Sequence, residues 1–269
     1  MTTLTISIVT YYVDQRVFLE VLESLSRAVA DVIDKGVVQQ TKLIIVDNGD
    51  DQDFLHKAVT DLITFDANVI ANKKNIGFGR AHNLVLKDCE SDLHLVLNPD
   101  AILQLDALTI GCRYLKDNKE TVMVGPLAKL PSGTRAYLCK RYPNVFDLLL
   151  RGFSPAWMRR VFKKRLGRYE CRDYPDDMVT RDVRILSGCF MLARTKSLIA
   201  ADGFNYNYFL YFEDFDLSLK IASFGSIDYL PQMRIVHGGG GAAKKGFSHV
   251  LFFCRSAFTF FNKNGWKFF

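Results

Sequence analysis

Three carboxylates stand within four residues at Glu213-Asp214-Phe215-Asp216, directly after an aromatic stretch at 206–212. Carboxylates this close repel one another, so the pKa of at least one of them should be raised. A raised pKa is what a carboxylate needs to act as a general base near neutral pH. Acidic residues also gather at helix N-termini. Both interpretations can hold together, with Asp214 as the base and Asp216 at the start of a helix.

Another carboxylate, Asp100, follows an apolar run that ends at Asn98-Pro99. Because proline cannot donate to a sheet ladder, we expect the strand to stop at Asn98. Asp100 would then lie at the carboxyl end of a strand, where open α/β sheets bind their ligands. A carboxylate there suits a divalent cation that also holds a diphosphate. The alternative is an aspartate that caps a helix over 101–115.

Three further motifs have the residue types of a nucleotide site. Asp47 follows an apolar stretch at 42–46 and could accept hydrogen bonds from a base or ribose, although a solvated turn is the alternative. The glycine-containing turn at 75–81 could bring backbone N–H groups and Arg80 to a phosphate at a helix start. His237, followed by four glycines, could reach a metal or a phosphate from its loop.

Strands and helices must alternate to position these residues. Hydrophobic patterns predict strands at 4–10, 42–46, 67–70 and 93–97, with helices at 16–33 and 54–65 and another that ends at 86. This alternation is typical of βαβ units and a mainly parallel sheet. Beyond 125 we expect a strand at 184–193, a helix at 217–224 and short strands at 227–230 and 234–236, whereas 129–182 looks irregular. With no repeat and no linker, the pattern predicts one compact α/β domain with a C-terminal appendage.

Composition excludes several classes of protein. The chain has 269 residues, of which 49% are apolar and 24% charged, as in ordinary globular proteins. Its six cysteines form no CxxC pair, which argues against a zinc site or a disulfide framework and favours a reducing compartment. No basic N-terminal region indicates a signal peptide, and no apolar run approaches a membrane span. We therefore expect a cytoplasmic protein.

The net charge of +6 is unevenly distributed. Residues 151–172 hold eight Lys/Arg and one Glu, and residues 234–269 hold six Lys/Arg and no acid, so the remainder is acidic. Aromatic and aliphatic residues are interleaved with both sets of cations, as in segments that lie on an anionic membrane. The alternatives are that the first segment supports an acceptor loop and that the tail packs across the domain.

The order of the motifs resembles the family 2 inverting glycosyltransferases with the GT-A fold, and most closely a bacterial rhamnosyltransferase branch. The motifs that carry this resemblance are Asp47-Asn48, Asn75-Ile76-Gly77-Phe78-Gly79, Leu97-Asn98-Pro99-Asp100, Ser187-Gly188, Phe212-Glu213-Asp214-Phe215-Asp216-Leu217 and His237. The resemblance implies a Rossmann-like GT-A domain over 1–237, with a nucleotide-sugar half at 1–125 and an acceptor-binding, catalytic half at 126–237. The tail at 238–269 would be helical and close to a membrane.

The resemblance also implies roles for single residues at the donor. Those that would contact the nucleotide-sugar are Thr10, Tyr11, Asp47, Asn75, Gly77, Arg80, Asn98 and Asp100. Asp100 and His237 would hold Mg²⁺ or Mn²⁺, and Asn98 stands where many relatives carry a first aspartate. This substitution removes one carboxylate from the usual metal clamp.

On the acceptor side, Asp214 matches the base of the family, with Glu213 beside it as a second candidate. The residues that would contact the acceptor are Ser187, Gly188, Asp216 and Arg141. Arg80, with Lys244 or Lys245, would stabilise the charge that develops on the leaving diphosphate.

The resulting expectation is an inverting, metal-dependent transfer of a sugar to a saccharide acceptor. The favoured donor is dTDP-L-rhamnose, and the favoured acceptor is polyprenyl-diphosphate-linked, as in O-antigen or capsule synthesis at the inner face of the plasma membrane. A UDP-hexose donor is an alternative. A sugar-phosphate nucleotidyltransferase would need a glycine-rich basic loop where Thr10-Tyr11-Tyr12 stands. A nucleic-acid-binding protein fits poorly, because the strand-end loops are acidic.

Overall fold

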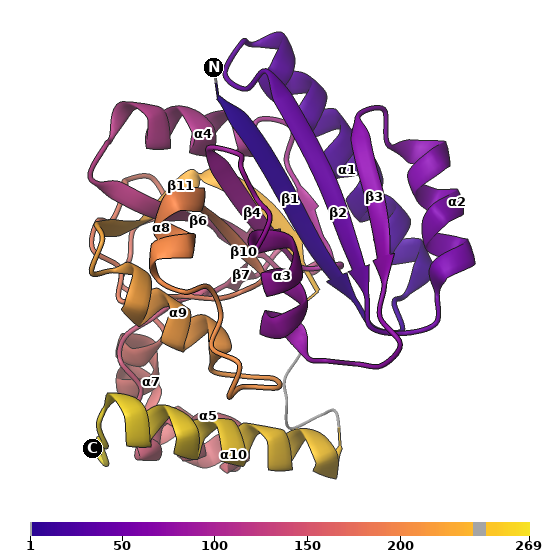
Figure 1. Ribbon diagram of the computed structural model, residues 1–269. Coiled ribbons are helices and arrows are strands. Elements are labelled where there is room, and N and C mark those ends of the chain that lie inside the picture. Colours follow the sequence, from indigo (N-terminus) through magenta and orange to yellow (C-terminus); the bar gives the residue numbers. More distant parts are fainter. Residues whose placement is uncertain (1, 239–245) are drawn as a thin grey trace.

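The computed structural model describes residues 2–238 and 246–269 and contains one mixed α/β domain (Figure 1). Its first half alternates between strands and helices, except that β5 follows β4 directly. The elements of this half are β1 (Thr3–Thr10), α1 (Gln15–Asp34), β2 (Gln40–Asp47), α2 (Gln52–Leu62), β3 (Asp66–Ala71), α3 (Phe78–Leu86), β4 (Leu93–Leu97), β5 (Ala101–Leu103) and α4 (Ala107–Asp117). The predicted βαβ pattern is therefore confirmed.

The second half is less regular. Its elements are β6 (Thr121–Lys129), β7 (Arg135–Ala136), β8 (Cys139–Lys140), α5 (Val145–Phe153), α6 (Ala156–Val161), α7 (Lys163–Tyr169), β9 (Ile185–Leu186), β10 (Phe190–Arg194), α8 (Thr195–Ala200), α9 (Glu213–Ile221), β11 (Ser226–His237) and α10 (Phe247–Asn264). The segment at 129–182, predicted as irregular, thus contains three short helices. The two strands expected at 227–230 and 234–236 form one strand, β11, which is irregular between Leu230 and Arg234.

The central sheet has the order β3-β2-β1-β4-β10-β6-β11-β5, with β7 paired to β6. The first four strands are parallel, whereas β10 runs antiparallel to both β4 and β6. The sheet is therefore mixed rather than mainly parallel in its second half. Because β10 lies antiparallel between β4 and β6, strands β6 and β11 run in the same direction as β1. The carboxyl ends of β1, β2, β4 and β11 consequently meet at one edge.

Pairing with β11 also corrects the expectation for the residues after Asp100. Residues 101–103 form β5, an edge strand antiparallel to the end of β11, with His237 opposite Ala101. Helix α4 begins only at Ala107, after Asp106. Asp100 therefore caps no helix, and the alternative interpretation of this residue is wrong.

The main hydrophobic core lies between the sheet and helices α1, α2 and α4. A second core, under α8 and α9, packs on the other side around Met191, Leu217 and Phe204. Helix α10 lies across the end of the domain beside α5 and α7 (Figure 1). Its Phe260 and Phe261 are buried in one cluster with Phe212, the residue directly before α9, and with Tyr169 of α7. No helix within the described ranges is long and apolar enough to cross a membrane.

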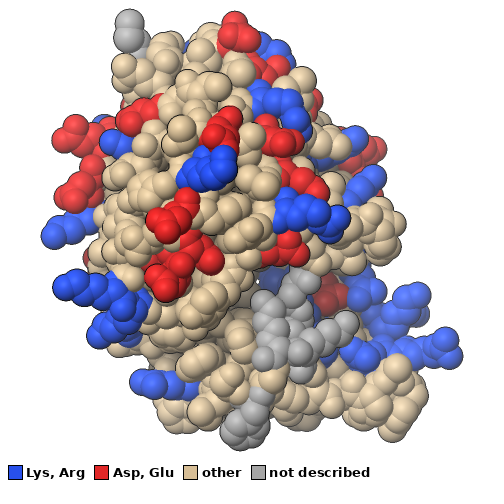
Figure 2. Space-filling model, turned by 90° about the vertical axis from the view of Figure 1, so that its right-hand side faces the viewer, with Lys and Arg blue, Asp and Glu red and all other residues tan. Residues whose placement is uncertain are grey.

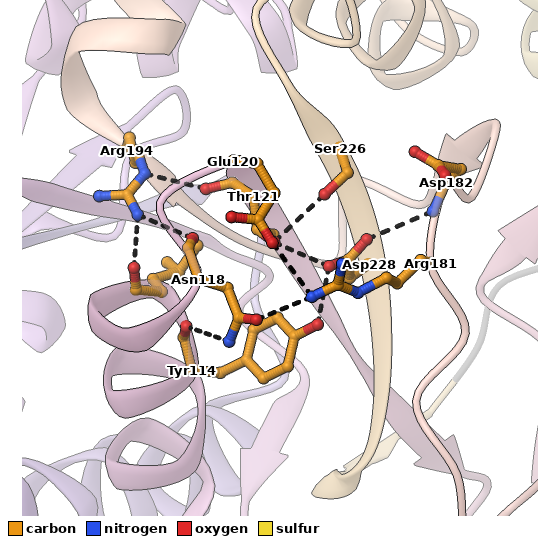
Figure 3. Close-up of polar contacts among 10 residues, drawn as sticks. Tyr114, Asn118, Glu120, Thr121, Arg181, Asp182, Arg194, Ser226 and Asp228 are labelled. Atoms are coloured by element: carbon orange, nitrogen blue, oxygen red, sulfur yellow. Dashed lines mark hydrogen bonds and ion pairs between the residues drawn. The ribbon is translucent and has the colours of Figure 1, made fainter.

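A polar network at the opposite edge of the sheet ties β6 and β11 together (Figure 3). The buried carboxylate of Asp228 accepts hydrogen bonds from the hydroxyls of Tyr114 (2.9 Å) and Thr121 (2.8 Å) and from the Asp182 amide (3.3 Å). Arg181 donates beside it to the side chains of Asn118 and Glu120. Because these residues lie near the amino ends of β6 and β11, we interpret the network as structural.

Two buried histidines form a second polar network, between α3 and the sheet. The Ser7 hydroxyl lies 2.7 Å from Nδ1 of His82 and 2.8 Å from Nε2 of His94, and Sγ of Cys89 lies 3.4 Å from Nδ1 of His94. Burial lowers the pKa of His94 to about 4 and holds that of His82 well below 6.5. The folded protein therefore keeps both rings neutral near neutral pH.

This burial predicts loss of stability in mild acid. As the pH falls below 6.5, the unfolded chain takes up protons at these histidines before the folded chain does. We expect full stability above that pH and a fall toward pH 4, on the order of 3 kcal/mol from His94 alone. Urea unfolding between pH 4 and pH 6.5 measures this change in the free energy of unfolding. His94→Gln should flatten the profile and His56→Gln, at an exposed site, should not; equal slopes in the two variants would refute the assignment.

Candidate active site

The carboxyl ends of β1 and β2 bring Thr10 beside Asp47. The two residues are register partners, and the Thr10 hydroxyl donates to Oδ1 of Asp47 at 2.9 Å. Oδ1 also accepts from the Gly49 amide (3.0 Å), and Oδ2 accepts from the Asp51 amide (3.1 Å). Asp47 is fully buried. Its carboxylate therefore shapes the 47–51 loop, and any contact with a nucleotide base would be added to these bonds.

Asn48 joins this loop to the turn before α3. Its side-chain Nδ2 donates to the Gly77 carbonyl (3.3 Å), and its Oδ1 accepts from Nδ2 of Asn72 (2.8 Å). Asn75 closes the turn by accepting from the Gly77 amide at 2.8 Å. Gly77 has φ +91°, and a Cβ at this position would lie 2.4 Å from the Phe209 carbonyl oxygen. The turn requires glycine for both reasons.

Arg80 and Tyr11 have different surroundings. The guanidinium of Arg80 donates to the Tyr206 carbonyl through Nε (2.9 Å) and a terminal nitrogen (2.5 Å). This contact links α3 to the segment that precedes α9, so a contact of Arg80 with a diphosphate stays a prediction. Tyr11 is 53% exposed and its ring lies 4.6 Å from that of Tyr12. Contact of this exposed side chain with a nucleotide base stays a prediction.

Asp100 and His237 meet where β4 and β11 end. Nδ1 of His237 lies 3.1 Å from Oδ1 of Asp100, and this buried nitrogen forms no hydrogen bond with a described residue. Gly238 follows so closely that a Cβ there would lie 3.5 Å from Oδ2 of Asp100. Lys244 and Lys245, expected near the diphosphate, lie outside the described residues.

These two side chains fit a divalent cation that is shared with a substrate. Within the described residues no group of three or more His, Cys, Asp or Glu could hold a metal. One carboxylate and one imidazole form an incomplete set, which leaves the other coordination positions to phosphate oxygens and water. Mg²⁺ is commonly held in this way, by one or two carboxylates together with substrate phosphates. Asn98 adds no carboxylate; its backbone amide donates to the Cys189 carbonyl at 2.9 Å.

The segment 187–189 connects the Asp100 turn to the acidic cluster. The Cys189 carbonyl accepts from Asn98, and the Gly188 amide donates to Oδ2 of Asp214 at 2.9 Å. A Cβ on Gly188 would lie 3.2 Å from the Phe78 ring and 3.3 Å from Cβ of Asp214. Burial and, to a smaller extent, the charges of Asp100 and Asp214 raise the pKa of the Cys189 thiol to about 12. The structure therefore brings the predicted metal and base residues into one site.

Glu213 and Asp214 open helix α9 and have different environments. Burial raises the pKa of Glu213, and the charge of Asp214 raises it further; Oε2 of Glu213 is buried and has no hydrogen-bond partner among the described residues. Burial also raises the pKa of Asp214, but the amides of Gly188 and Phe215 donate to its carboxylate and oppose the shift. The two amides thus stabilise the charged form of Asp214, whereas nothing among the described residues donates to Oε2 of Glu213, so the environment favours the charge on Asp214.

The backbone before α9 is strained. Tyr211 (φ +70°) and Phe212 (φ +65°) both adopt left-handed conformations, which are rare for bulky residues. The Phe212 ring is held by Phe215, Phe253 and Phe260 at centroid distances of 5.1–5.3 Å. Packing against α10 thus maintains the turn that presents the two carboxylates. Such outliers cluster at functional sites.

Two residues predicted to contact the acceptor are engaged elsewhere. Asp216 is fully buried and accepts from Nζ of Lys263 at 2.9 Å and from the Tyr208 hydroxyl at 3.4 Å, so it ties α9 to α10. Arg141 forms a two-point ion pair with Asp173 at 2.9 and 2.7 Å. These contacts have structural roles, and contact of Asp216 or Arg141 with the acceptor stays a prediction. Ser187 and Gly188 remain in the site.

Sequence analysis missed Lys140, a buried cation of the site. It lies on β8, is 5% exposed and donates to the carbonyls of Tyr137 and Cys139. Burial lowers its pKa to about 8, and its charge lowers the pKa of Asp214. Only the short pairing of β8 with β9 brings it here. Nothing in its sequence neighbourhood distinguishes Lys140 from the other cations.

Comparisons with known proteins agree with this architecture. A curated relative, the rhamnosyltransferase WbbL of Escherichia coli K12, is 25% identical over 170 residues, which span 60% of this chain and 60% of the relative. Among solved structures, the mannosyltransferase PcManGT from Pyrobaculum calidifontis, with GDP-Man and Mn²⁺, has a TM-score of 0.57 at 14% identity and covers 91% of this chain and 58% of that one. GalNAc-T7, with UDP, GalNAc and Mn²⁺, has a TM-score of 0.60 at 15% identity and covers 93% and 47%.

The fold is thus that of the GT-A glycosyltransferase structures, at identities too low to carry over a substrate. The family model described as "Glycosyl transferase family 2" matches residues 7–198, which is well over half of the sequence. The chain therefore belongs to glycosyl transferase family 2.

Proposed function

We propose that this glycosyltransferase moves a sugar from a nucleotide-sugar to a saccharide hydroxyl with inversion at the anomeric carbon. The observation that supports it most is the pair of neighbouring carboxylates of unequal environment at Glu213 and Asp214, connected through Gly188 to the Asp100–His237 pair. The Glu213/Asp214 pair would supply the base, and the Asp100–His237 pair would hold the diphosphate through a metal ion. Residues 1–125 would bind the donor and residues 126–237 the acceptor.

In the proposed reaction Asp214 removes the proton from the acceptor hydroxyl as its oxygen attacks the anomeric carbon. The bond to the diphosphate breaks on the opposite face, so a single displacement inverts the configuration. The Gly188 and Phe215 amides keep Asp214 oriented and ionised before the attack. Asp100 and His237 would hold Mg²⁺ or Mn²⁺, which supplies charge stabilisation to the leaving diphosphate. Mn²⁺ is present in the two structures compared above.

The finer proposal is L-rhamnose transfer from dTDP-L-rhamnose to a polyprenyl-diphosphate-linked saccharide at the cytoplasmic face of the plasma membrane. The similarity to a rhamnosyltransferase supports the donor. The exposed apolar side chains beside cations on α6 and α10 support contact with an anionic membrane. One face of α10 packs on the domain, so the predicted membrane contact falls to its exposed face, which includes Leu251 and Phe258.

A panel of nucleotide-sugars tests this proposal. Release of nucleoside diphosphate is measured with Mg²⁺ or Mn²⁺, with and without a lipid-linked saccharide. We expect dTDP-L-rhamnose to be turned over fastest, and NMR of the product to show the inverted anomer. Preference for a UDP-hexose would replace the donor and keep the reaction class. A retained configuration, or no turnover with any sugar, would overturn the mechanism.

A further inference from the structure

Helices α5, α6 and α7 border a cavity of about 520 Å³ that is open to solvent and lined by exposed cations. Five of the residues that line it are basic and one is acidic: Arg151, Arg159, Arg160, Lys163, Arg172 and Glu170. In the view of Figure 2, Lys and Arg stand out at the lower left and lower right, the end at which α10 lies in Figure 1, whereas most of the acids lie higher. So concentrated a positive charge attracts an anionic ligand.

The one acid in the cavity is already neutralised. Oε1 of Glu170 lies 3.1 Å from Nε of Arg151, and its Oε2 lies 2.6 Å from a terminal nitrogen of Arg172. Arg159, Arg160 and Lys163 have no ion-pair partner among the residues that the structure describes. Three cations that share one hollow without counter-charges repel one another, and a ligand with two or more negative charges would relieve this repulsion. The planar guanidinium group of each arginine presents its donors in a fork that matches two phosphate oxygens.

Exposed apolar side chains, here called the apolar rim, neighbour the lining residues of the cavity in the sequence. Trp157 and Val161 stand one turn apart on α6, are 67% and 69% exposed, and do not line the cavity. Phe153, at the end of α5, is 48% exposed, and its ring lies 6.3 Å from that of Phe253 on α10. A free anion would gain nothing from these side chains, whereas an amphiphile would place its charged head in the cavity and its chain along them.

We propose that this cavity binds the diphosphate of a lipid-linked ligand. Helix α7, which forms one wall, also carries Tyr169, which packs in one cluster with Phe212 next to the catalytic carboxylates. A diphosphate held here would therefore lie on the acceptor side of the enzyme. The identification of this ligand with the acceptor rests on the proposed function; the diphosphate site itself does not.

A direct binding experiment without any nucleotide-sugar tests the site. Farnesyl diphosphate and inorganic pyrophosphate are titrated into the full chain by calorimetry at near-physiological ionic strength. The cavity variant Arg159→Gln/Arg160→Gln/Lys163→Gln should lose at least about tenfold in affinity for farnesyl diphosphate, because it lacks three charged donors. The control variant Lys87→Gln/Lys119→Gln/Lys196→Gln removes the same charge at exposed sites outside the cavity and should bind as the wild type does.

A second variant tests the apolar rim. Trp157→Gln/Val161→Gln should weaken binding of farnesyl diphosphate severalfold and leave pyrophosphate binding unchanged. Equal losses in the cavity and control variants would show a general charge effect and overturn the site. Pyrophosphate bound as tightly as farnesyl diphosphate would overturn the lipid assignment. Binding to phosphatidylglycerol vesicles is measured in parallel. If the cavity variant loses only this binding, the ligand is the bilayer surface, and the lipid diphosphate assignment is overturned. Failure of sugar transfer affects none of these outcomes.

Discussion

Asp214→Asn is expected to lower kcat by about 10²- to 10⁴-fold, the usual contribution of a positioned general base. Asparagine has nearly the same shape but cannot take the proton from the acceptor hydroxyl. Donor affinity should change little, because Asp214 contacts the Gly188 and Phe215 amides rather than the strand-end loops. Steady-state transfer and donor binding by calorimetry separate the two effects. Full transfer by the variant would remove Asp214 as the base.

Glu213→Gln is the matched control for this experiment. Glutamine resembles the protonated glutamate that the buried site favours, so activity should stay within about tenfold of the wild type. Activity of the wild type should rise with pH through the raised pKa of the Asp214 carboxylate, because the base works only when ionised. A larger loss in Glu213→Gln than in Asp214→Asn would exchange the two roles.

The positions of residues at strand ends could be predicted from the sequence. Thr10 and Asp47 follow consecutive apolar runs, and parallel pairing necessarily brings them together. Asp100 and His237 are separated by 137 residues, yet Asp100 follows β4 and His237 is the last residue of β11, and the common direction of these strands brings the two residues together. Local pattern and sheet geometry agree at these positions, so the placement of these residues could be predicted, whereas their roles stay predictions.

Residues whose partners come from distant, irregular segments could not be predicted. Asp216 lies in an acidic cluster like that of a functional carboxylate, but it forms an ion pair with Lys263, 47 residues later in α10. Arg141 is likewise fixed by Asp173, 32 residues away. The helices in 129–182 were missed; their buried residues Leu148 and Tyr169 pack in one cluster with Phe260 of α10, which lies far along the sequence. No local periodicity reports such packing.

Asp100→Ala tests the other half of the site. Asp100 lies at ion-pair distance from His237 and would supply a carboxylate to the proposed metal site. We expect the variant to lose most of its Mn²⁺ affinity, measured by electron paramagnetic resonance of the free ion. Turnover should fall by about 10²-fold or more, because charge stabilisation worth several kcal/mol is lost from the leaving diphosphate.

Asp106→Ala provides the control for this prediction. Asp106 lies six residues later at an exposed position and makes no side-chain hydrogen bond to the start of α4. Its removal changes the net charge equally and should leave Mn²⁺ binding and turnover unaltered. His237→Ala should lower Mn²⁺ affinity less than Asp100→Ala does, because a neutral imidazole attracts the cation less than a carboxylate. Full turnover of Asp100→Ala in a chelator would exclude a metal held by Asp100. The positive charge that stabilises the leaving diphosphate would then have to come from the protein's own cations.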